Sequence, residues 1–182
     1  MQTKYIRNQT RFLVFPDSCQ HREMAVKALG RDKIIHGAGF MRLKFVENNI
    51  EAECYGESES LNRGPRRDDC EHIIKAIGVE NEEMVEHAKY VIWRGKAVVF
   101  SNELEHKTVA EAAFHGYSDC EHAGFVKFLV HPSGKVKVQC YGESMSLGVS
   151  SGKEDYKIIA ELMELPEDML FQPSQDNSFV VK

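Results

Sequence analysis

The chain repeats itself, and this repeat constrains its fold more than any other feature of the sequence. The pentapeptide CYGES stands at Cys54–Ser58 and again at Cys140–Ser144. A shift of the sequence by 85 residues places AGF at Ala38 on AGF at Ala123. Because only two copies are present, a solenoid is disfavoured, and we expect a duplicated unit whose halves pack on each other.

Each copy has the pattern of an α+β unit with the order ββαββα. A first hairpin is predicted at Tyr5–Phe15 and at Tyr90–Phe100, and a helix follows each of them. A second hairpin follows, in which apolar and polar residues alternate. A final helix is predicted at about Asp68–Ile77 and Gly152–Met163. We therefore predict antiparallel sheets with helices on one face, related by a pseudo-two-fold duplication.

The repeat also predicts the organisation of the chain. We expect a first repeat at 1–86, a second repeat at 87–170 and a C-terminal tail at 171–182. The tail ends in SFVVK, a short apolar β-former. It is predicted to add a strand to a neighbouring edge, within the chain or in a homo-oligomer, or else to stay loosely ordered.

Composition and charge argue against several classes of protein. The formal net charge of −5 disfavours a general nucleic-acid binder, whose affinity depends on basic contacts to phosphate. The sequence contains no uncharged apolar stretch of membrane-spanning length, and its first residues lack the apolar region of a signal peptide. Five cysteines without CxxC spacing favour free thiols in a reducing compartment. We expect a cytoplasmic protein.

The alternation in the second hairpin gives each letter of CYGES a direction. The cysteines point inward, as small and commonly buried residues do. Tyr55 and Tyr141 point to the wetter face, beside Phe40 and Phe125. These rings either pack across the strands or form a stacking platform for a ring-bearing ligand. The glycine that follows ends the strand.

A polar loop follows CYGES in each copy and leads to a helix start. Its hydroxyls, glycines and basic side chains favour anion binding, because a helix start offers free N–H groups and the positive end of the helix dipole. The alternative is that the serines cap and turn the chain while the arginines are solvated. The first copy has three arginines where the second has Ser150, Ser151 and Lys153. If both loops bind, we expect them to bind different ligands or to bind unequally. Alternatively, the loops face each other across a pseudo-two-fold axis and build one shared site.

The sequence indicates no catalytic or metal-binding constellation. DCEH occurs at Asp69–His72 and Asp119–His122, at positions that do not match between the copies and without a usual zinc spacing. His21 and His106 do match, and we expect them to be structural or surface residues. A nucleotide hydrolase that uses one of them is a remaining alternative. GxSxG and P-loop patterns are absent, and no cofactor is expected.

Short motifs in both copies resemble a group of small uncharacterised phage and prophage proteins. The pattern is AGF, a hairpin, YGxSxSL, a polar loop and an ED-x-x-II-type helix. It is carried by Ala123–Phe125, Cys140–Leu147 and Glu154–Ile159, and more weakly by Ala38–Phe40, Cys54–Leu61 and Asp69–Ile74. The resemblance implies a phage accessory protein in the host cytoplasm. Small oligomeric α+β proteins of phages include anti-defence factors that bind and sequester nucleotide signals.

These observations lead to the hypothesis of a non-enzymatic protein that binds a small anionic, nucleotide-like ligand. The rings would stack, the hydroxyls and cations would hold phosphates, and Glu57 or Glu143 would accept a hydrogen bond from a ribose or base. The predicted site residues are Phe40, Tyr55, Glu57, Ser58, Ser60, Arg63, Arg66, Arg67, Phe125, Tyr141, Glu143, Ser144, Ser146 and Lys153. The alternative is a protein-interaction module that docks a host protein or a second copy of the chain.

Overall fold

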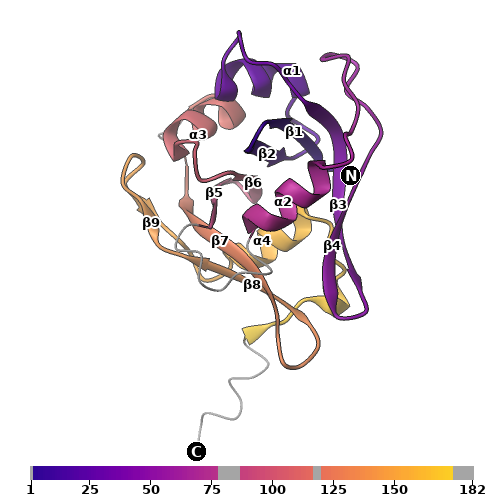
Figure 1. Cartoon of the computed structure of the whole chain (residues 1–182). Coiled ribbons are helices and arrows are strands. Elements are labelled where there is room, and N and C mark those ends of the chain that lie inside the picture. The colour runs from indigo at the N-terminus through magenta and orange to yellow at the C-terminus, as the bar shows by residue number, and fades with distance from the viewer. Residues whose placement is uncertain (1, 78–86, 117–119, 174–182) are drawn as a thin grey trace, which may run out of the picture.

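The computed structural model of the chain describes residues 2–77, 87–116 and 120–173 (Figure 1). Its strands are β1 (Lys4–Asn8), β2 (Arg11–Phe15), β3 (Gly37–Val46), β4 (Asn49–Tyr55), β5 (Ala88–Trp93), β6 (Lys96–Phe100), β7 (His122–Val130), β8 (Val136–Tyr141), β9 (Glu143–Ser144) and β10 (Val149–Ser150). Its helices are α1 (His21–Met24) with the π-helical continuation η1 (Ala25–Leu29), α2 (Asp69–Ile77), α3 (His106–Phe114), α4 (Asp155–Leu162) and the 3-10 turn η3 (Glu167–Met169).

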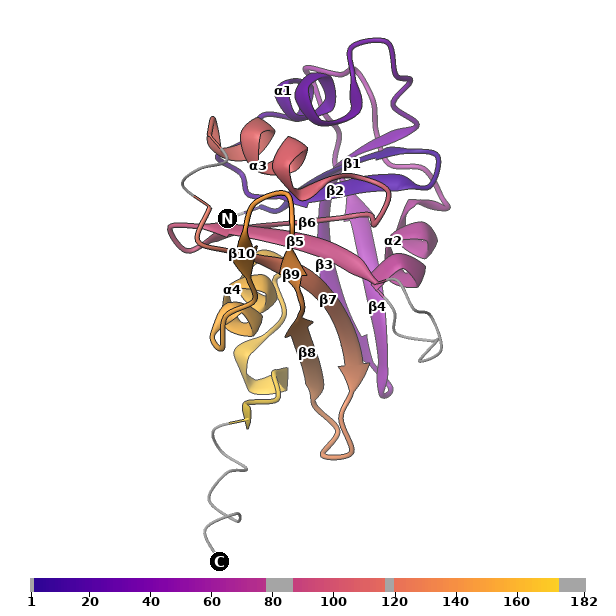
Figure 2. The same ribbon diagram turned by 90° about the vertical axis from the view of Figure 1, so that its left-hand side faces the viewer.

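The strands combine into one large antiparallel sheet. Its eight strands have the order β4-β3-β1-β2-β6-β5-β7-β8, and β9 pairs separately with β10. The first and second halves of the chain join where β2 pairs with β6, with Leu13 opposite Phe100 and Val14 opposite Val99. The sheet curls around α2 and α4 (Figure 1, Figure 2). The fold is therefore α+β, and both halves share a single sheet.

Helices cover both faces of this sheet. On one face, α2 and α4 cover a cluster that includes Tyr5, Phe12 and Val14, which we call the inner core. On the other face, α1, η1 and α3 cover a cluster that includes Ile6 and Leu13, which we call the outer core. The prediction that the helices lie on one face is therefore wrong.

The first hairpins explain this arrangement. In β2 the side chains of Phe12–Phe15 are all fully buried, although successive residues of a strand point to opposite faces. The residues Ala97–Phe100 of β6 are likewise buried. Continuous apolar runs of this kind need cover on both faces, because each face otherwise exposes apolar surface to water.

The second hairpins follow the predicted alternation more closely. Met41, Leu43 and Ile50 of the β3–β4 hairpin are buried in the inner core, whereas the intervening Arg42 and Lys44 are exposed. The β7–β8 hairpin behaves similarly, with Val126, Phe128, Val136 and Val138 in the inner core. These hairpins form the two edges of the sheet, and one face of each is left partly open.

The last described residues run beside β8. Leu170 forms a parallel bridge with Val136, and the Phe171 N–H donates to the Val136 carbonyl at 2.8 Å. The strand predicted at SFVVK lies outside the described residues. Within the described ranges, no helix has both the length and the apolar character needed to cross a membrane.

Candidate functional site

The aromatic side chains of the predicted site pack against each other. Tyr55 lies directly across from Phe40, and Tyr141 lies across from Phe125. The ring centroids are 5.9 Å and 5.8 Å apart, with nearly parallel planes. All four rings are partly exposed. The rings therefore stack across the strands, as one of the two sequence interpretations expects, and keep some surface open to solvent.

A histidine closes one edge of each aromatic pair. His21 and His106 are buried at the starts of α1 and α3, with their rings edge-on to Phe40 and Phe125. The Nε2 atoms lie 2.8 Å from the carbonyl oxygens of Gly39 and Gly124. Burial lowers the pKa of both histidines, which favours the neutral ring. This setting is that of a structural histidine. It also places the aromatic pairs on the side of the sheet that carries α1 and α3.

The glycine of CYGES is required by the ring beside it. Gly56 and Gly142 have φ of 69° and 79°, which favours glycine. A Cβ atom at Gly142 would come within 2.9 Å of the Phe125 ring, and one at Gly56 within 2.7 Å of the Phe40 ring. The repeated YG dipeptide is therefore explained by packing.

The serines of CYGES are used inside their own loops. Ser58 and Ser144 are buried, and their Oγ atoms accept hydrogen bonds from the backbone N–H of Leu61 and Leu147 at 3.3 and 3.2 Å. Each Oγ also lies within 3.4 Å of the hydroxyl two residues on. The leucines pack against the outer core. This geometry is that of a serine turn that carries the chain around the sheet edge.

The helix start after the first loop already holds an internal carboxylate. Asp69 is fully buried, and its Oδ2 accepts the Arg66 backbone N–H at 2.7 Å and the Tyr5 hydroxyl. Its Oδ1 accepts from Arg7 Nε at 2.5 Å. Burial, followed by the hydrogen bond to Asp69, raises the pKa of Tyr5 well above its usual range, so the hydroxyl remains a donor. An aspartate therefore occupies the place where the loop was predicted to hold a phosphate.

The second helix start has the same arrangement, with a histidine in place of the arginine. Asp155 Oδ2 accepts the Gly152 N–H at 2.6 Å and the Tyr90 hydroxyl at 2.5 Å. Its Oδ1 lies 2.7 Å from His122 Nδ1. Tyr90 and Asp155 are buried like their counterparts, whereas the His122 side chain is 43% exposed. Sequence reasoning missed these carboxylates because the tyrosine that donates to each of them lies more than 60 residues away along the chain.

The remaining predicted site residues are exposed and dispersed. Arg63 donates from Nε to the Ile35 carbonyl at 3.1 Å. Seven other predicted residues of these loops are also exposed, namely Glu57, Ser60, Arg66, Arg67, Glu143, Ser146 and Lys153. The helix starts belong to the inner-core side of the sheet, whereas the stacked rings belong to the opposite side. The sheet therefore separates the rings from the helix starts.

The two CYGES loops do not meet. Figure 1 shows the loop after β4 on one side of the molecule and the β9–β10 loop on the opposite side. The arrangement in which both loops build one shared cleft is therefore not formed within this chain.

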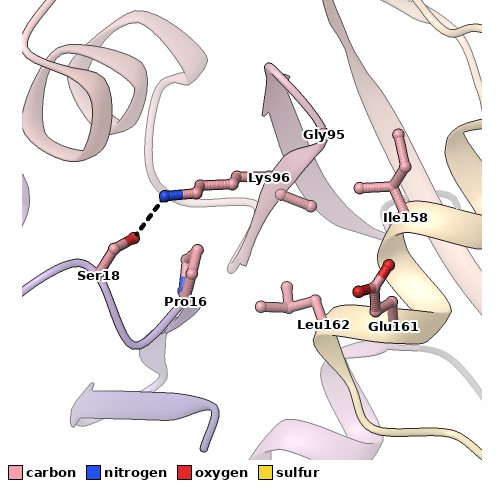
Figure 3. Close-up of a pocket in the computed structure, with 8 residues that line it drawn as sticks. Pro16, Ser18, Gly95, Lys96, Ile158, Glu161 and Leu162 are labelled. Atoms are coloured by element: carbon pink, nitrogen blue, oxygen red, sulfur yellow. Dashed lines mark hydrogen bonds between the residues drawn. The ribbon is translucent and has the colours of Figure 1, made fainter. Parts of the chain in front are cut away.

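The cavities lined by described residues lie away from the predicted site residues. One of about 100 Å³ lies between the loop after β2, the β5–β6 turn and α4 (Figure 3). Its lining includes Pro16, Ile158 and Leu162, and Lys96 Nζ donates to Ser18 Oγ at 3.2 Å beside it. Three other cavities have volumes of about 510, 320 and 390 Å³, within the range of about 300–1,000 Å³ that is usual for ligand pockets, but no predicted site residue lines them. No group of three or more His, Cys, Asp or Glu residues in the described ranges is arranged to hold a metal ion.

The open faces of the two edge hairpins differ in their charge. On β3–β4, Glu53 accepts from Arg42 Nε at 2.7 Å and from Lys44 Nζ at 2.9 Å. On β7–β8, Lys127 pairs across the strands with Gln139, and Leu129 pairs with Lys137. No described carboxylate forms an ion pair with either lysine of β7–β8, so this face keeps its positive charge.

His87 lies beside the second aromatic pair. The Tyr141 hydroxyl and His87 Nδ1 share a hydrogen bond, and the two rings meet edge-on at 5.8 Å. His87 Nε2 is buried and has no hydrogen-bond partner among the described residues. Burial and the charge of Lys127 lower the pKa of His87. Neither His87 nor Lys127 belongs to a repeated motif, which is why sequence reasoning did not select them.

Comparison with known proteins gives no information about the function of this chain. No protein-family model, curated protein or solved structure matches the chain.

Proposed function

We propose that this chain is a non-enzymatic protein that binds a small, anionic, ring-bearing ligand of the nucleotide class. The surface that would bind it is the open face of the β7–β8 hairpin, formed by Phe125, Lys127, Lys137, Gln139 and Tyr141, which we call the β7–β8 face. The observation that carries the proposal is a partly exposed aromatic pair beside two lysines that have no described carboxylate partner.

The charge of the β7–β8 face favours an anion. At the corresponding place on β3–β4, Glu53 forms ion pairs with both Arg42 and Lys44. A phosphate would supply the missing negative charge to Lys127 and Lys137. Charge-assisted contacts of this kind are roughly twice as strong as neutral hydrogen bonds. The β7–β8 face is therefore the better candidate of the two.

The aromatic pair favours a ligand with a planar ring. Phe125 and Tyr141 are held in place by strand pairing, by each other and by the edge of His106. A preorganised ring loses little conformational freedom when a ligand stacks on it. Stacking of a base on an aromatic side chain contributes about 1–3 kcal/mol.

Polar groups at the rim would give the ligand an orientation. The Gln139 side chain offers a donor and an acceptor next to Lys127. His87 is fixed by Tyr141, and its Nε2 is the buried polar atom for which no described partner exists. In the tautomer that accepts from Tyr141 at Nδ1, Nε2 carries the proton and donates.

The two halves of the chain are, in this proposal, copies of one ββαββα unit. The support comes from contacts that recur at matching positions. The matching contacts are His21–Gly39 with His106–Gly124, Tyr5–Asp69 with Tyr90–Asp155, and Ser58–Leu61 with Ser144–Leu147. The copies keep these structural contacts while their open faces differ in charge. Together with the resemblance to phage and prophage proteins, this pattern fits sequestration of a nucleotide signal by the second copy.

Ligand-dependent thermal stability tests the proposal. The probes are ATP, GTP and cyclic mono- and dinucleotides, added separately to the full chain. A ligand present at 100 times its Kd stabilises the folded state by about 2.7 kcal/mol. For a chain of this length, that raises Tm by about 5–10 °C. We expect at least one nucleotide to act at about tens of micromolar, within the usual range for metabolites.

Matched variants locate the site. Lys127→Gln and Lys137→Gln are expected to weaken binding, because each removes a charge from the β7–β8 face. Arg42→Gln removes a charge from the corresponding face of β3–β4 and is expected to leave binding unchanged. Loss of binding in Arg42→Gln alone, or no nucleotide response at millimolar concentration, would overturn the proposal. Retention of a protein partner by all three variants would support an interaction module instead.

A further inference from the structure

A second pair of stacked rings lies near the tip of the β7–β8 hairpin. His131 directly follows β7, and its N–H donates to the Lys135 carbonyl at 2.7 Å, so the hairpin pairing continues to this residue. Its ring stacks on Phe171, with centroids 3.8 Å apart and planes that differ by 20°. Both side chains are partly exposed. The function proposed above does not use this pair.

Backbone contacts hold Phe171 in place. Leu170 is buried in the inner core, has an extended backbone and forms a parallel bridge with Val136. The Phe171 N–H donates to the Val136 carbonyl at 2.8 Å. Because successive residues of an extended segment point to opposite sides, the Phe171 side chain points away from the inner core. The ring is therefore preorganised on the open side of the hairpin.

This second ring pair belongs to the β7–β8 face. Lys137 of that face has its Nζ atom 5.9 Å from the centroid of the Phe171 ring. Along β7, the alternation of side chains places His131 on the same side as Phe125 and Lys127. The β7–β8 face therefore has a ring pair at each end.

The two lysines of the face lie between the two ring pairs. A strand rises by about 3.3 Å per residue, which places His131 about 20 Å from Phe125 along the hairpin. Lys127 lies within this interval on β7, and Lys137 lies within it on β8. A mononucleotide has one base and can stack at one end only. A ligand with a base at each end and phosphates between them matches the order of ring, cation and ring.

The β3–β4 hairpin does not have this arrangement among the described residues. The shift of 85 residues places Val46 at the position of His131. Arg42 Cζ lies 5.6 Å from the centroid of the Tyr55 ring, so a cation already covers part of the ring pair of the first half. A face with two ring pairs is therefore a feature of the second half.

We propose that the β7–β8 face binds a dinucleoside polyphosphate, with one base on the Phe125–Tyr141 pair and the other on the second ring pair. This inference rests on the function proposed above and narrows its ligand class. Lys127 and Lys137 would contact the phosphates that join the bases. The net charge of −5 disfavours a longer nucleic-acid strand, whose additional phosphates would extend beyond the two lysines.

Titration calorimetry on the full chain tests the inference. The probes are diadenosine and diguanosine tetraphosphate, each compared with ATP or GTP, which carries the same base once. A further stacked base is expected to lower the Kd by about 5–150-fold, with one ligand bound per chain. If a mononucleotide binds and its dinucleoside counterpart binds no more tightly, the inference is wrong and the proposed function stands. No response to any of the four probes would overturn the inference and would also count against the proposed function.

A double variant locates the second base. His131→Ala combined with Phe171→Ala removes both rings and keeps the backbone N–H that pairs with β8. We expect the Kd of the dinucleoside tetraphosphate to rise to near that of the mononucleotide, whose own Kd should not change. Val46→Ala, at the corresponding place in the first half, is the control and should change neither value. An equal loss of mononucleotide binding in the double variant would overturn the inference, as would tighter binding of a four-nucleotide single strand.

Discussion

At the residue scale, the most informative difference between the halves is the nitrogen-bearing side chain beside each buried aspartate. In the first half, Arg7 on β1 binds Asp69, and the residue across from Arg7 on β3 is Gly37. In the second half the partner of the aspartate is on the other strand of the corresponding pair. His122 on β7 contacts Asp155, and its cross-strand neighbour on β5 is Ile92.

Steric fit explains why the first half has no side chain at Gly37, the position that corresponds to His122. A Cβ atom at Gly37 would lie within 2.6 Å of all three carboxylate atoms of Asp69. No side chain fits there while the aspartate keeps its present position. In both halves a buried carboxylate therefore contacts a tyrosine and one nitrogen-bearing side chain. That side chain comes from β1 in the first half and from β7 in the second.

The difference predicts unequal effects of removing the two carboxylates. Asp69→Asn leaves Arg7, whose side chain is 5% exposed, without its buried counterion, and we expect a loss of about 3–5 kcal/mol in the free energy of unfolding. Asp155→Asn leaves His122, whose side chain is 43% exposed, and we expect a loss of about 1–3 kcal/mol. Urea unfolding of both variants measures the difference.

A neighbouring aspartate provides the control. Asp68 contacts the same arginine at 3.0 Å, but its side chain is 51% exposed. Asp68→Asn is expected to change the free energy of unfolding by less than about 1 kcal/mol. Equal losses in Asp69→Asn and Asp155→Asn would contradict the assignment of Arg7 as the dominant buried charge.

At the scale of elements, α1 and α3 are seated on the sheet by their first residues. His21 and His106 begin these helices, and each reaches a glycine carbonyl on the second hairpin. Neither helix has a side-chain cap at its N-terminus. The contact between helix and sheet therefore depends on a neutral histidine that donates one hydrogen bond.

Buried neutral histidines predict loss of stability at acid pH. Burial lowers the pKa of His21 and His106 in the folded state, whereas the unfolded chain titrates near the ordinary value of 6.5. The unfolded chain therefore takes up protons first as the pH falls. The contribution of these residues is complete above about pH 6.5 and is lost below it, by at most about 1.4 kcal/mol per pH unit for each histidine. Denaturant unfolding between pH 5 and 8 measures this slope.

Replacement of the buried histidines tests their part in the slope. His21→Gln and His106→Gln keep an amide N–H that can donate to the glycine carbonyl but do not titrate. We expect the double variant to have a flatter dependence of stability on pH than the wild type. His115→Gln, at a site where the side chain is 69% exposed, is the control and should leave the slope unchanged. A wild-type slope in the double variant would show that other groups cause it.

At the scale of the whole molecule, both halves contribute to each core. The inner core contains Tyr5 and Ile73 from the first half with Tyr90 and Ile159 from the second. The outer core likewise combines residues of both halves around the β2–β6 pairing. A core of this kind cannot lose one half without exposing apolar side chains of the other.

The shared cores predict a single cooperative unfolding transition. Trp93 is the only tryptophan, and it stacks on Phe114 in the second half. Its fluorescence and far-UV circular dichroism should report the same midpoint. Asp69→Asn, a change in the first half, should shift the Trp93 transition as far as it shifts the circular dichroism. A Trp93 midpoint unaffected by Asp69→Asn would indicate that the halves unfold independently.

The sequence predicted the local parts of this molecule well. The alternation of β3–β4 and β7–β8, the inward cysteines and the cross-strand aromatic pairs all depend on neighbours a few residues away. The contacts that hold α1 and α3 on the sheet were not predicted, since each joins a helix start to a carbonyl of the second hairpin. The predicted cover on one face was wrong because the apolar run in β2 was treated as part of an ordinary hairpin.

In the candidate site, too, contacts between distant residues were not predicted from the sequence. The sequence placed rings, hydroxyls and helix starts in one continuous motif, but the motif crosses the edge of the sheet, so the rings and the helix starts lie on opposite sides. The buried contacts of Asp69 and Asp155, and the lack of a carboxylate partner for Lys127 among the described residues, depend on how folding brings distant residues together. The spacing of residues along the sequence therefore cannot predict these features.

By itself, the sequence determined the class of fold, the positions of the hairpins and the direction of each letter in CYGES, because these follow from periods of two and 3.6 residues and from local turns. Only the tertiary structure decided that the two halves share one sheet, that helices cover both of its faces and that the predicted phosphate site holds an aspartate. Those features are set by which distant surfaces bury each other, and burial of apolar surface has no preferred distance along the chain.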